Sequence, residues 1–356
     1  MFPTGPNGSQ PQRDCSKRQQ RGILSRAPPS STCKRREARD IPSDKIMPAA
    51  RRITLPVLAA TLLASLCVAQ FRFGRGGWGG DTGPMVQTEG GDWVNEDTVR
   101  TARETAPHSL DLPPWTNTPG FEKDVFVFTR VIFKSTPGGP SWLGWINDYP
   151  DADLNLSARL QSLTSIRTDP DCRVLKLTDP ALADYPFLFL SHPERMNLRE
   201  AEAQALRKHL LNGGSLLVDD FWGEWSWNYF EGQMKRLLPE RAWTELSMDH
   251  PLFHCVFDLP GPMSRLQVPT LQLWRRHYDP DDPEAFPSAF RGQGSRQMRV
   301  RAWLDDKQRI MVLAIHNSDT GDGWEREGED EVYFHQFSEN RAYPLAVNAI
   351  FYLMTH

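Results

Sequence analysis

Two short apolar runs in the middle of the chain are typical of strands that are buried on both faces. YPFLFLSH (185–192) and LLVDD (216–220) are almost continuously apolar and end in polar residues. Strands of a parallel sheet covered by helices on both sides have this composition, because neither face meets water. VFVFTRVIF (125–133), which is β-branched and aromatic, and RVLKL (173–177) predict two further strands.

The segment between the two apolar runs predicts a helix. Asn197 and Glu200 have the spacing of a capping box, and Gly213 or Gly214 provides a left-handed stop. A strand–helix–strand unit of this length connects two parallel strands.

The order of the predicted elements places the folded body in the α/β class. Further helices are predicted over 154–163, 225–238 and 343–355, and further strands over 296–304 and 308–317, which a turn at Asp305–Asp306 joins. A turn-rich stretch fills the chain between 238 and about 295. Strands that alternate with helices in this way predict a doubly wound, mostly parallel sheet.

Residues 47–69 have the arrangement of a secretory signal peptide. Arg51–Arg52 precede an apolar run over 53–69, which ends in small residues before Gln70. The run is shorter than the roughly 20 residues that a membrane-spanning helix needs. We therefore expect an exported, periplasmic protein. An uncleaved anchor at 53–69 is the alternative, and it would be the only contact with a membrane.

Charge separates the flanking segments from the body. Residues 1–46 carry ten basic and four acidic residues and little apolar content, which predicts a disordered extension, or a start-site artefact if translation begins at Met47. Residues 70–120 are rich in Gly and Pro and predict a linker before a folded domain at 121–356. Residues 70–356 contain 29 basic and 41 acidic residues, a balance that argues against nucleic acid as a partner.

Five motifs, in order along the chain, resemble a known family. They are YPFLFLSH, LREAEAQALRKHLLNGGSLLVDDFWG, DHPLFHCVFDL, IHNSDTGDGWE and NRAYPLAVNAIFYLMTH. Together they resemble the domain-of-unknown-function family DUF4159 over residues 121–356. The resemblance implies a flavodoxin-like fold related to the class I glutamine amidotransferases. It implies no reaction, because Asp219–Asp220 ends the strand where true amidotransferases carry a cysteine nucleophile at a strand-to-helix elbow.

Polar residues at the predicted strand ends are the candidates for a ligand-binding site. They are Asp219, Asp220, Glu224, His192 and His316, with Glu194, Asn317 and Asp319 beside them. Ligands of doubly wound sheets bind beyond the carboxyl ends of the strands. We therefore expect these side chains to share one crevice. The alternative is that an aspartate there only caps the next helix or turn.

Two further clusters are weaker candidates for a cation site. His250 and His254 have the i, i+4 spacing of a metal site, but Pro251 lies between them, so we predict a capped turn around Asp249–His254 and no metal. The acidic segment 315–331 lacks the regular spacing of an EF-hand and is predicted to form a solvated loop. No cofactor is predicted.

Aromatic and cysteine residues leave two alternatives each. The tryptophans either form a platform that stacks on a sugar or complete the hydrophobic core. They are Trp222, Trp225, Trp227, Trp142 and Trp145. Cys172 and Cys255 either pair in an oxidising compartment or pack as small hydrophobic residues.

These patterns predict a non-catalytic module that binds a small ligand or an envelope protein. The alternative is a carboxylate-dependent hydrolase that uses Asp219, Asp220 and Glu224. A catalytic site predicts a carboxylate of raised pKa inside a closed cavity, whereas an interaction module predicts an exposed apolar patch.

Overall fold

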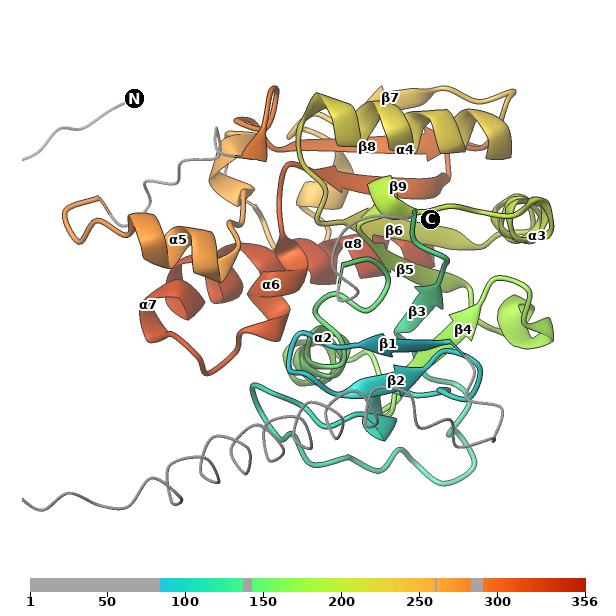
Figure 1. Ribbon diagram of the computed structural model, residues 1–356, viewed down its shortest axis with the longest axis horizontal. Helices are drawn as coiled ribbons and strands as arrows, with labels where there is room; N and C mark the ends of the chain where they lie inside the picture. The colour runs from blue at the N-terminus through green and yellow to red at the C-terminus, as the bar shows by residue number, and fades with distance from the viewer. Residues whose placement is uncertain (1–83, 137–142, 260, 283–290) are drawn as a thin grey trace, which may run out of the picture. The chain divides into compact units, whose positions relative to one another are not determined.

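In the computed structural model, which describes residues 84–136, 143–259, 261–282 and 291–356, a seven-stranded sheet forms the centre of the folded body (Figure 1). Its strands are, across the sheet, β4 (Arg173–Lys176), β3 (Thr129–Ile132), β5 (Phe187–Ser191), β6 (Ser215–Asp219), β9 (Ile310–His316), β8 (Arg299–Leu304) and β7 (Trp243–Glu245). The first five are parallel, and β8 is antiparallel to both β9 and β7. The predicted doubly wound, mostly parallel α/β sheet is confirmed.

The order of the parallel strands determines where a ligand would bind. In chain order they are β3, β4, β5, β6 and β9, so the sheet has the flavodoxin-like order 2-1-3-4-5. The chain first moves to one edge, at β4, and then returns past β3 to β5. The strands β3 and β5 therefore flank the topological switch point, where crevices form at the carboxyl ends of the strands.

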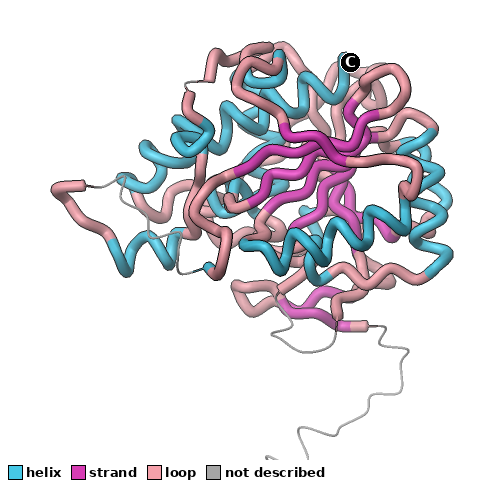
Figure 2. The backbone as a smooth tube through the Cα atoms, turned by 90° about the horizontal axis from the view of Figure 1, so that it is seen from above, coloured by secondary structure: helices cyan, strands magenta, loops and turns pink. Residues whose placement is uncertain are grey.

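Helices cover both faces of the sheet (Figure 2). The helices α3 (Glu200–Leu211) and α4 (Gly223–Leu237) pack together on one face, and α2 (Asp151–Leu163), α6 (Thr320–Glu325) and α8 (Tyr343–Thr355) pack together on the other. Every residue of β5, β6 and β9 is buried, as expected for strands with no wet face. Gly213, two residues after the end of α3, has a φ of 108°, a left-handed conformation that favours glycine.

Short elements complete the described part of the chain. They are α5 (Leu271–His277), α7 (Glu331–Tyr333), a π-helical segment (Phe334–Ala342) that leads into α8, and 3-10 helices at Ala102–Glu104, Pro180–Asp184, Pro193–Arg195, Pro251–Phe253 and Met263–Leu266. Part of the stretch predicted to be only turns is therefore helical. No helix among the described residues is long and apolar enough to cross a membrane. The predicted extension 1–46 and the signal segment 47–69 lie outside the described residues.

The second half of the predicted linker is folded onto the α/β domain. A hairpin of β1 (Met85–Gln87) and β2 (Trp93–Asn95) precedes a buried turn, in which the amide of Ala102 donates to the carbonyl of Asp171 at 2.9 Å. The amides of His108 and Ser109 donate to the buried carboxylate of Asp151, at 2.9 and 2.8 Å. Three-residue strands between Gly- and Pro-rich segments leave no periodicity in the sequence, which is why the prediction missed them.

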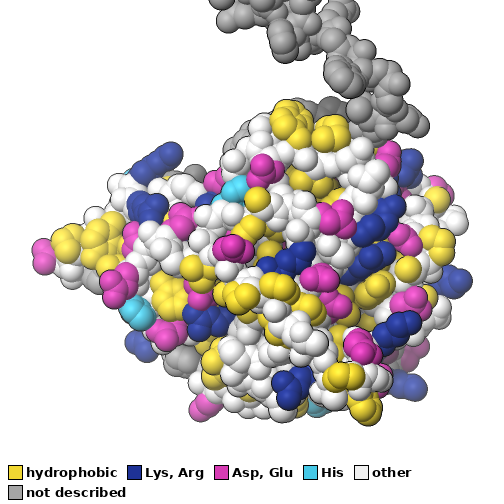
Figure 3. Space-filling model, turned by 90° about the horizontal axis from the view of Figure 1, so that it is seen from below, with side chains coloured by type: hydrophobic (Ala, Val, Ile, Leu, Met, Phe, Trp, Pro, Cys, Tyr) yellow, Lys and Arg dark blue, Asp and Glu magenta, His cyan; other side chains and the backbone are white. Residues whose placement is uncertain are grey.

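Acidic and basic side chains are interspersed on the face of the molecule shown in Figure 3. Neither sign of charge gathers into a single patch on this face.

Candidate functional site

The carboxyl edge of the sheet holds four residues in an unfavourable backbone conformation. His192, Asp220 and Asn317 directly follow β5, β6 and β9, with φ of 53°, 52° and 62°. Asp148, in the connection from β3 to α2, has a φ of 59°. A side chain in this left-handed region costs roughly 1–3 kcal/mol and persists where the surroundings impose it, most often at functional sites. Asp148, His192 and Asp220 line one cavity, whereas the Asn317 side chain bonds backbone groups of Gly223, Gly294 and Gln297.

A cavity of about 530 Å³ lies at this edge of the sheet. It is lined by Glu89, Leu143, Asn147, Asp148, His192, Glu194, Asp220, Trp222, Ser226, Thr270, Gln272, Arg276, Arg291, Asp319, Asp322 and Arg326. The connections that follow β3 and β5 both contribute, so the cavity lies at the topological switch point. Its six carboxylates exceed its three arginines and one histidine.

His192 lies between two carboxylates. Its Nε2 is 2.8 Å from Asp220 Oδ2, and its Nδ1 is 2.8 Å from Glu194 Oε1. Burial by itself would lower the pKa of His192, but the two carboxylates outweigh burial and raise the pKa well above its ordinary value. Burial would likewise raise the pKa of Asp220, but His192 outweighs it, and the pKa of Asp220 is lowered. The pair is therefore an imidazolium–carboxylate ion pair.

Asp148 and Asp319 have no comparable counter-ion. Asp148 Oδ1 accepts from Asn147 Nδ2 at 2.7 Å, whereas the buried Oδ2 of Asp148 has no hydrogen-bond partner. Asp319 Oδ2 is 4.0 Å from the guanidinium of Arg291, beyond hydrogen-bond length. Burial, and then the neighbouring carboxylates Asp220 and Asp322, raise the pKa of both groups well above the ordinary range.

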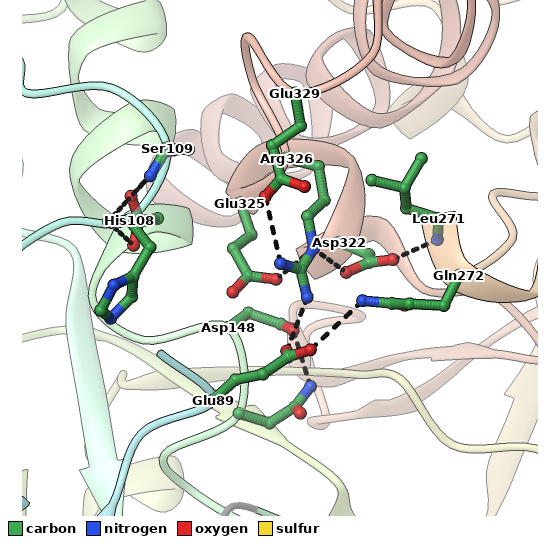
Figure 4. A network of polar contacts seen from close by, with 12 residues as sticks. Glu89, His108, Ser109, Asp148, Leu271, Gln272, Asp322, Glu325, Arg326 and Glu329 are labelled. Atoms are coloured by element: carbon green, nitrogen blue, oxygen red, sulfur yellow. Dashed lines mark hydrogen bonds and ion pairs between the residues drawn. The ribbon is translucent and has the colours of Figure 1, made fainter. Parts of the chain in front are cut away.

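Arg326 is the centre of a second polar network (Figure 4). Its guanidinium contacts four carboxylates, at 3.0 Å from Asp322, 2.9 Å from Glu325, 3.1 Å from Glu329 and 2.6 Å from Glu89. Glu89 comes from the loop between β1 and β2, and it also accepts from Gln272 at 3.2 Å. The hairpin therefore provides one wall of the cavity.

The acidic segment 315–331 is not the solvated loop that its composition predicts. Residues 320–325 form the buried helix α6, which Asp319 caps by accepting from the amide of Asp322 at 2.9 Å. Gly323 allows α6 to pack closely, because a Cβ there would lie 2.5 Å from Ala342. Arg326 offsets part of this buried charge, and burial raises the pKa of Glu325 well above its ordinary value.

The structure separates the five predicted site residues. His192 and Asp220 lie together in the cavity. Asp219 lies outside it, fully buried, where its Oδ2 accepts from the Thr320 hydroxyl at 2.6 Å and the Gly321 amide at 2.8 Å. It holds α6 against the end of β6, while burial raises its pKa to about 7. Glu224 is exposed in the first turn of α4 and does not line the cavity.

His316 also lies apart from the cavity, among aromatic side chains. Its Nε2 donates to the Gly223 carbonyl at 3.0 Å, and its Nδ1 faces Arg301 Nη1 at 3.4 Å. Its ring packs 4.8 Å from Phe221 and 5.5 Å from Trp227, measured between centroids. Burial, together with Arg301, lowers the pKa of His316 to about 3 although the Gly223 carbonyl opposes the shift. His316 is a neutral core residue.

We expect His316→Gln to reduce the loss of stability in mild acid. A histidine that titrates near 6.5 when unfolded and about 3 when folded favours the unfolded state below pH 6.5, so stability falls as the pH decreases through that window. Between pH 7 and pH 5 this group accounts for about 2 kcal/mol. Urea denaturation of both proteins at the two pH values measures the difference. An equal loss in wild type and variant would contradict the assignment.

The other candidate clusters have structural roles. His250 accepts from the amide of Leu252 at 3.2 Å and caps a 3-10 turn, as predicted, while His254 faces Asp258. Trp145 and Trp227 belong to the core, whereas Trp225 is exposed. Trp222 lines the cavity and donates to Asp220 Oδ1 at 2.9 Å, and Trp142 lies outside the described residues.

The two cysteines of the body are free thiols. Cys172 is buried and Cys255 is half-buried.

Sequence reasoning missed Asp148, Arg291 and Arg326, and it placed Asp322 only in the weaker acidic segment, which was predicted to be solvated. Ligands bind beyond the carboxyl ends of strands, and the strand predicted at 125–133 has such an end. Asp148 lies well beyond that end in the sequence, so its position gave no sign that it belongs to the site. Asp322 and Arg326 are four residues apart, the spacing of a helical ion pair, but the glycines between Thr320 and Trp324 conceal the helix. Arg291 carries no such signal.

A family model described as Domain of unknown function (DUF4159) matches residues 138–354. The matched region contains Asp148, Asp220, Asp319 and Arg326, but not Glu89. No curated protein matches the chain.

Proposed function

The chain belongs to the DUF4159 family, and we propose that its α/β domain is a ligand-binding module that holds a small, positively charged ligand at the carboxyl edge of the sheet. The observation that carries this proposal is the acidic lining of the cavity. Six carboxyl groups line it against three arginines and His192. Burial and the neighbouring carboxylates raise the pKa of Asp148 and Asp319, and a cation that takes the place of their protons would stabilise the ionised forms.

The form of the site supports a small ligand rather than a protein partner. A volume of about 530 Å³ is within the usual range of small-molecule sites. Asp148, Asp220 and Asp319 are almost fully buried, out of reach of a flat protein surface. Buried carboxyl groups that line a cavity favour a small-molecule site over an interaction module, which would present an apolar patch. The raised pKa of Asp148 and Asp319 is the feature that a catalytic site also predicts.

The proposal includes export. The proposal of export rests on the signal-like segment at 47–69. In an exported protein, the cavity would meet the solutes of the cell envelope. A hydrolase that uses Asp219, Asp220 and Glu224 together is not proposed, because Asp219 contacts α6 while Glu224 is exposed.

We expect small cations to raise the melting temperature of the protein. The probes are Ca²⁺, Mg²⁺, putrescine and spermidine, with citrate and phosphate as anionic comparators. A ligand at a hundred times its Kd adds about 2.7 kcal/mol, which corresponds to a rise of roughly 5–10 °C. Differential scanning fluorimetry measures the shift for each probe against the same protein without it.

Two variants connect the shift to the cavity. Asp220→Asn is expected to reduce the shift, because it removes one of the charges that a cation would meet. Asp184→Asn is the matched control, since Asp184 lines a second acidic cavity of about 500 Å³ beside the amino ends of β3 and β5 and should leave the shift unchanged. Stabilisation by the anions alone, or by none of the probes, would refute the proposed function.

A further inference from the structure

Three buried carboxylates from three different connections of the sheet meet in the cavity. Asp148 follows β3, Asp220 follows β6, and Asp319 follows β9. One oxygen from each lies within 4.8 Å of one from each of the others. Each of the three residues is at least 98% buried. Segments far apart in the chain therefore place three acidic groups at close range in a region of low dielectric, where their ionised forms are costly unless a cation compensates them.

Asp148 provides a second and independent observation. Its Oδ2 is buried, has no hydrogen-bond partner, and belongs to a side chain that lines the cavity. Buried carboxylate oxygens normally accept hydrogen bonds, and a vacant one is explained by a partner such as an ion. Figure 4 shows the Asp148 side chain beside Glu89, Glu325 and Arg326.

The neighbouring acidic cluster differs in its counter-charge. Asp148, Asp322 and Glu325 also lie within 4.8 Å of one another, but Arg326 is 3.0 Å from Asp322 and 2.9 Å from Glu325. In the first cluster, Asp220 is paired with His192, whereas Asp319 has only the distant Arg291 at 4.0 Å among its ion pairs and Asp148 has none among the described residues. Direct ion pairing is therefore weakest at Asp148 and Asp319.

We propose that Asp148, Asp220 and Asp319 bind one hard divalent cation, with Ca²⁺ preferred to Mg²⁺. This inference rests on the proposed function and names the ligand. The ligand set contains only oxygen, which suits Ca²⁺, Mg²⁺ or Mn²⁺ and disfavours softer metals. Ca²⁺ accepts a flexible arrangement of protein oxygens, whereas Mg²⁺ demands a near-ideal octahedron and gives up its water reluctantly. Three carboxylates held by separate connections of the sheet therefore favour Ca²⁺.

Terbium luminescence tests the site directly. Tb³⁺ replaces Ca²⁺ at oxygen sites, and its emission increases when an excited indole lies within a few ångströms. Trp222 donates to Asp220 Oδ1 at 2.9 Å and is therefore close to the proposed ion. Tryptophan-sensitised emission is expected on titration of Tb³⁺ into the full chain, and Ca²⁺ should displace it at lower concentration than Mg²⁺.

Substitutions at the ligands separate this site from adventitious binding. Asp148→Asn and Asp319→Asn keep the size of the side chain, and in the second variant the carboxamide oxygen can still accept from the Asp322 amide, so both variants should fold. Each is expected to weaken Ca²⁺ binding by about tenfold or more, since even indirect contacts to a metal contribute that much. Asp184→Asn, at the second acidic cavity, should bind Ca²⁺ as the wild type does. Circular dichroism confirms that each variant is folded.

The outcomes distinguish this inference from the proposed function. Absence of Ca²⁺ and Tb³⁺ binding, together with stabilisation by putrescine or spermidine, would overturn the metal site and leave the cationic ligand. Ca²⁺ binding that is unchanged in both Asn variants would also overturn it, because the ion would then be elsewhere. Failure of every cation would refute both proposals.

Discussion

Replacing Arg130 by methionine is expected to lower the free energy of unfolding by about 3–5 kcal/mol. Arg130 is fully buried in β3, and its Nε lies 2.9 Å from both oxygens of the fully buried Asp153. The variant leaves that carboxylate without a counter-charge. It also removes the donor that Nη1 provides to the carbonyls of Trp145 and Asn147, both at 2.8 Å. Urea denaturation at neutral pH measures the loss.

A second substitution separates the two roles of Arg130, as the counter-ion of Asp153 and as the donor to the Trp145 and Asn147 carbonyls. In the double variant Arg130→Met with Asp153→Leu, no buried charge is left unpaired, and most of the stability should return. The connection that carries Asp148 still lacks its anchor at the two carbonyls, so Ca²⁺ binding should remain weaker than in the wild type. A loss below about 1 kcal/mol in the single variant would show that the pair contributes little, as exposed pairs do.

Replacing Arg326 by methionine is expected to cost a similar amount, about 3–5 kcal/mol, and to make the protein more responsive to calcium. The substitution removes the counter-charge of Asp322 and Glu325, both almost fully buried. These carboxylates and Asp148 are then a second group of oxygens within 4.8 Å of one another. Ca²⁺ should therefore raise the melting temperature of the variant by more than it raises that of the wild type.

Arg275 provides the control for this prediction. It pairs with Asp330 at 3.1 Å and Glu329 at 4.0 Å, in the same acidic region of the chain, but its side chain is 43% exposed. Because exposed pairs contribute about 0–1 kcal/mol, Arg275→Met should be nearly neutral and should not alter the response to Ca²⁺. Equal losses for the two arginines would contradict the role assigned to Arg326.

The sheet could be predicted from the sequence because its signal is local. The runs that form β5 and β6 are apolar throughout, and the helix between them has a clear beginning and end in the sequence. The α/β fold class and the parallel pairing of β5 with β6 could therefore be predicted from this pattern. The same pattern located the edge of the sheet where His192 and Asp220 meet. Their contact at 2.8 Å depends on the parallel register that sets Ser191 opposite Asp219.

The remainder of the site depends on pairings across long sequence separations. Asp148 belongs to the site because Arg130 holds the backbone of its connection, and Asp322 is buried because Arg326 lies beside it. Composition alone made 315–331 appear solvated, since a run of acids is usually exposed. Only the three-dimensional arrangement shows that a single guanidinium contacts three of them.

The position of Glu89 has a practical consequence for dissecting this protein. A fragment that begins at residue 138, where the family match starts, would lack both the hairpin that carries Glu89 and the strand β3. A fragment that begins at residue 121, the domain start that the sequence predicts, would keep β3 but lack the hairpin and the segment from Ala102 to Ser109 that bonds to the domain. In it Arg326 would lose one carboxylate at 2.6 Å, Gln272 would lose its acceptor at 3.2 Å, and the cavity would open on that side. This second fragment would retain all seven strands of the central sheet while presenting a binding site that the whole chain does not have.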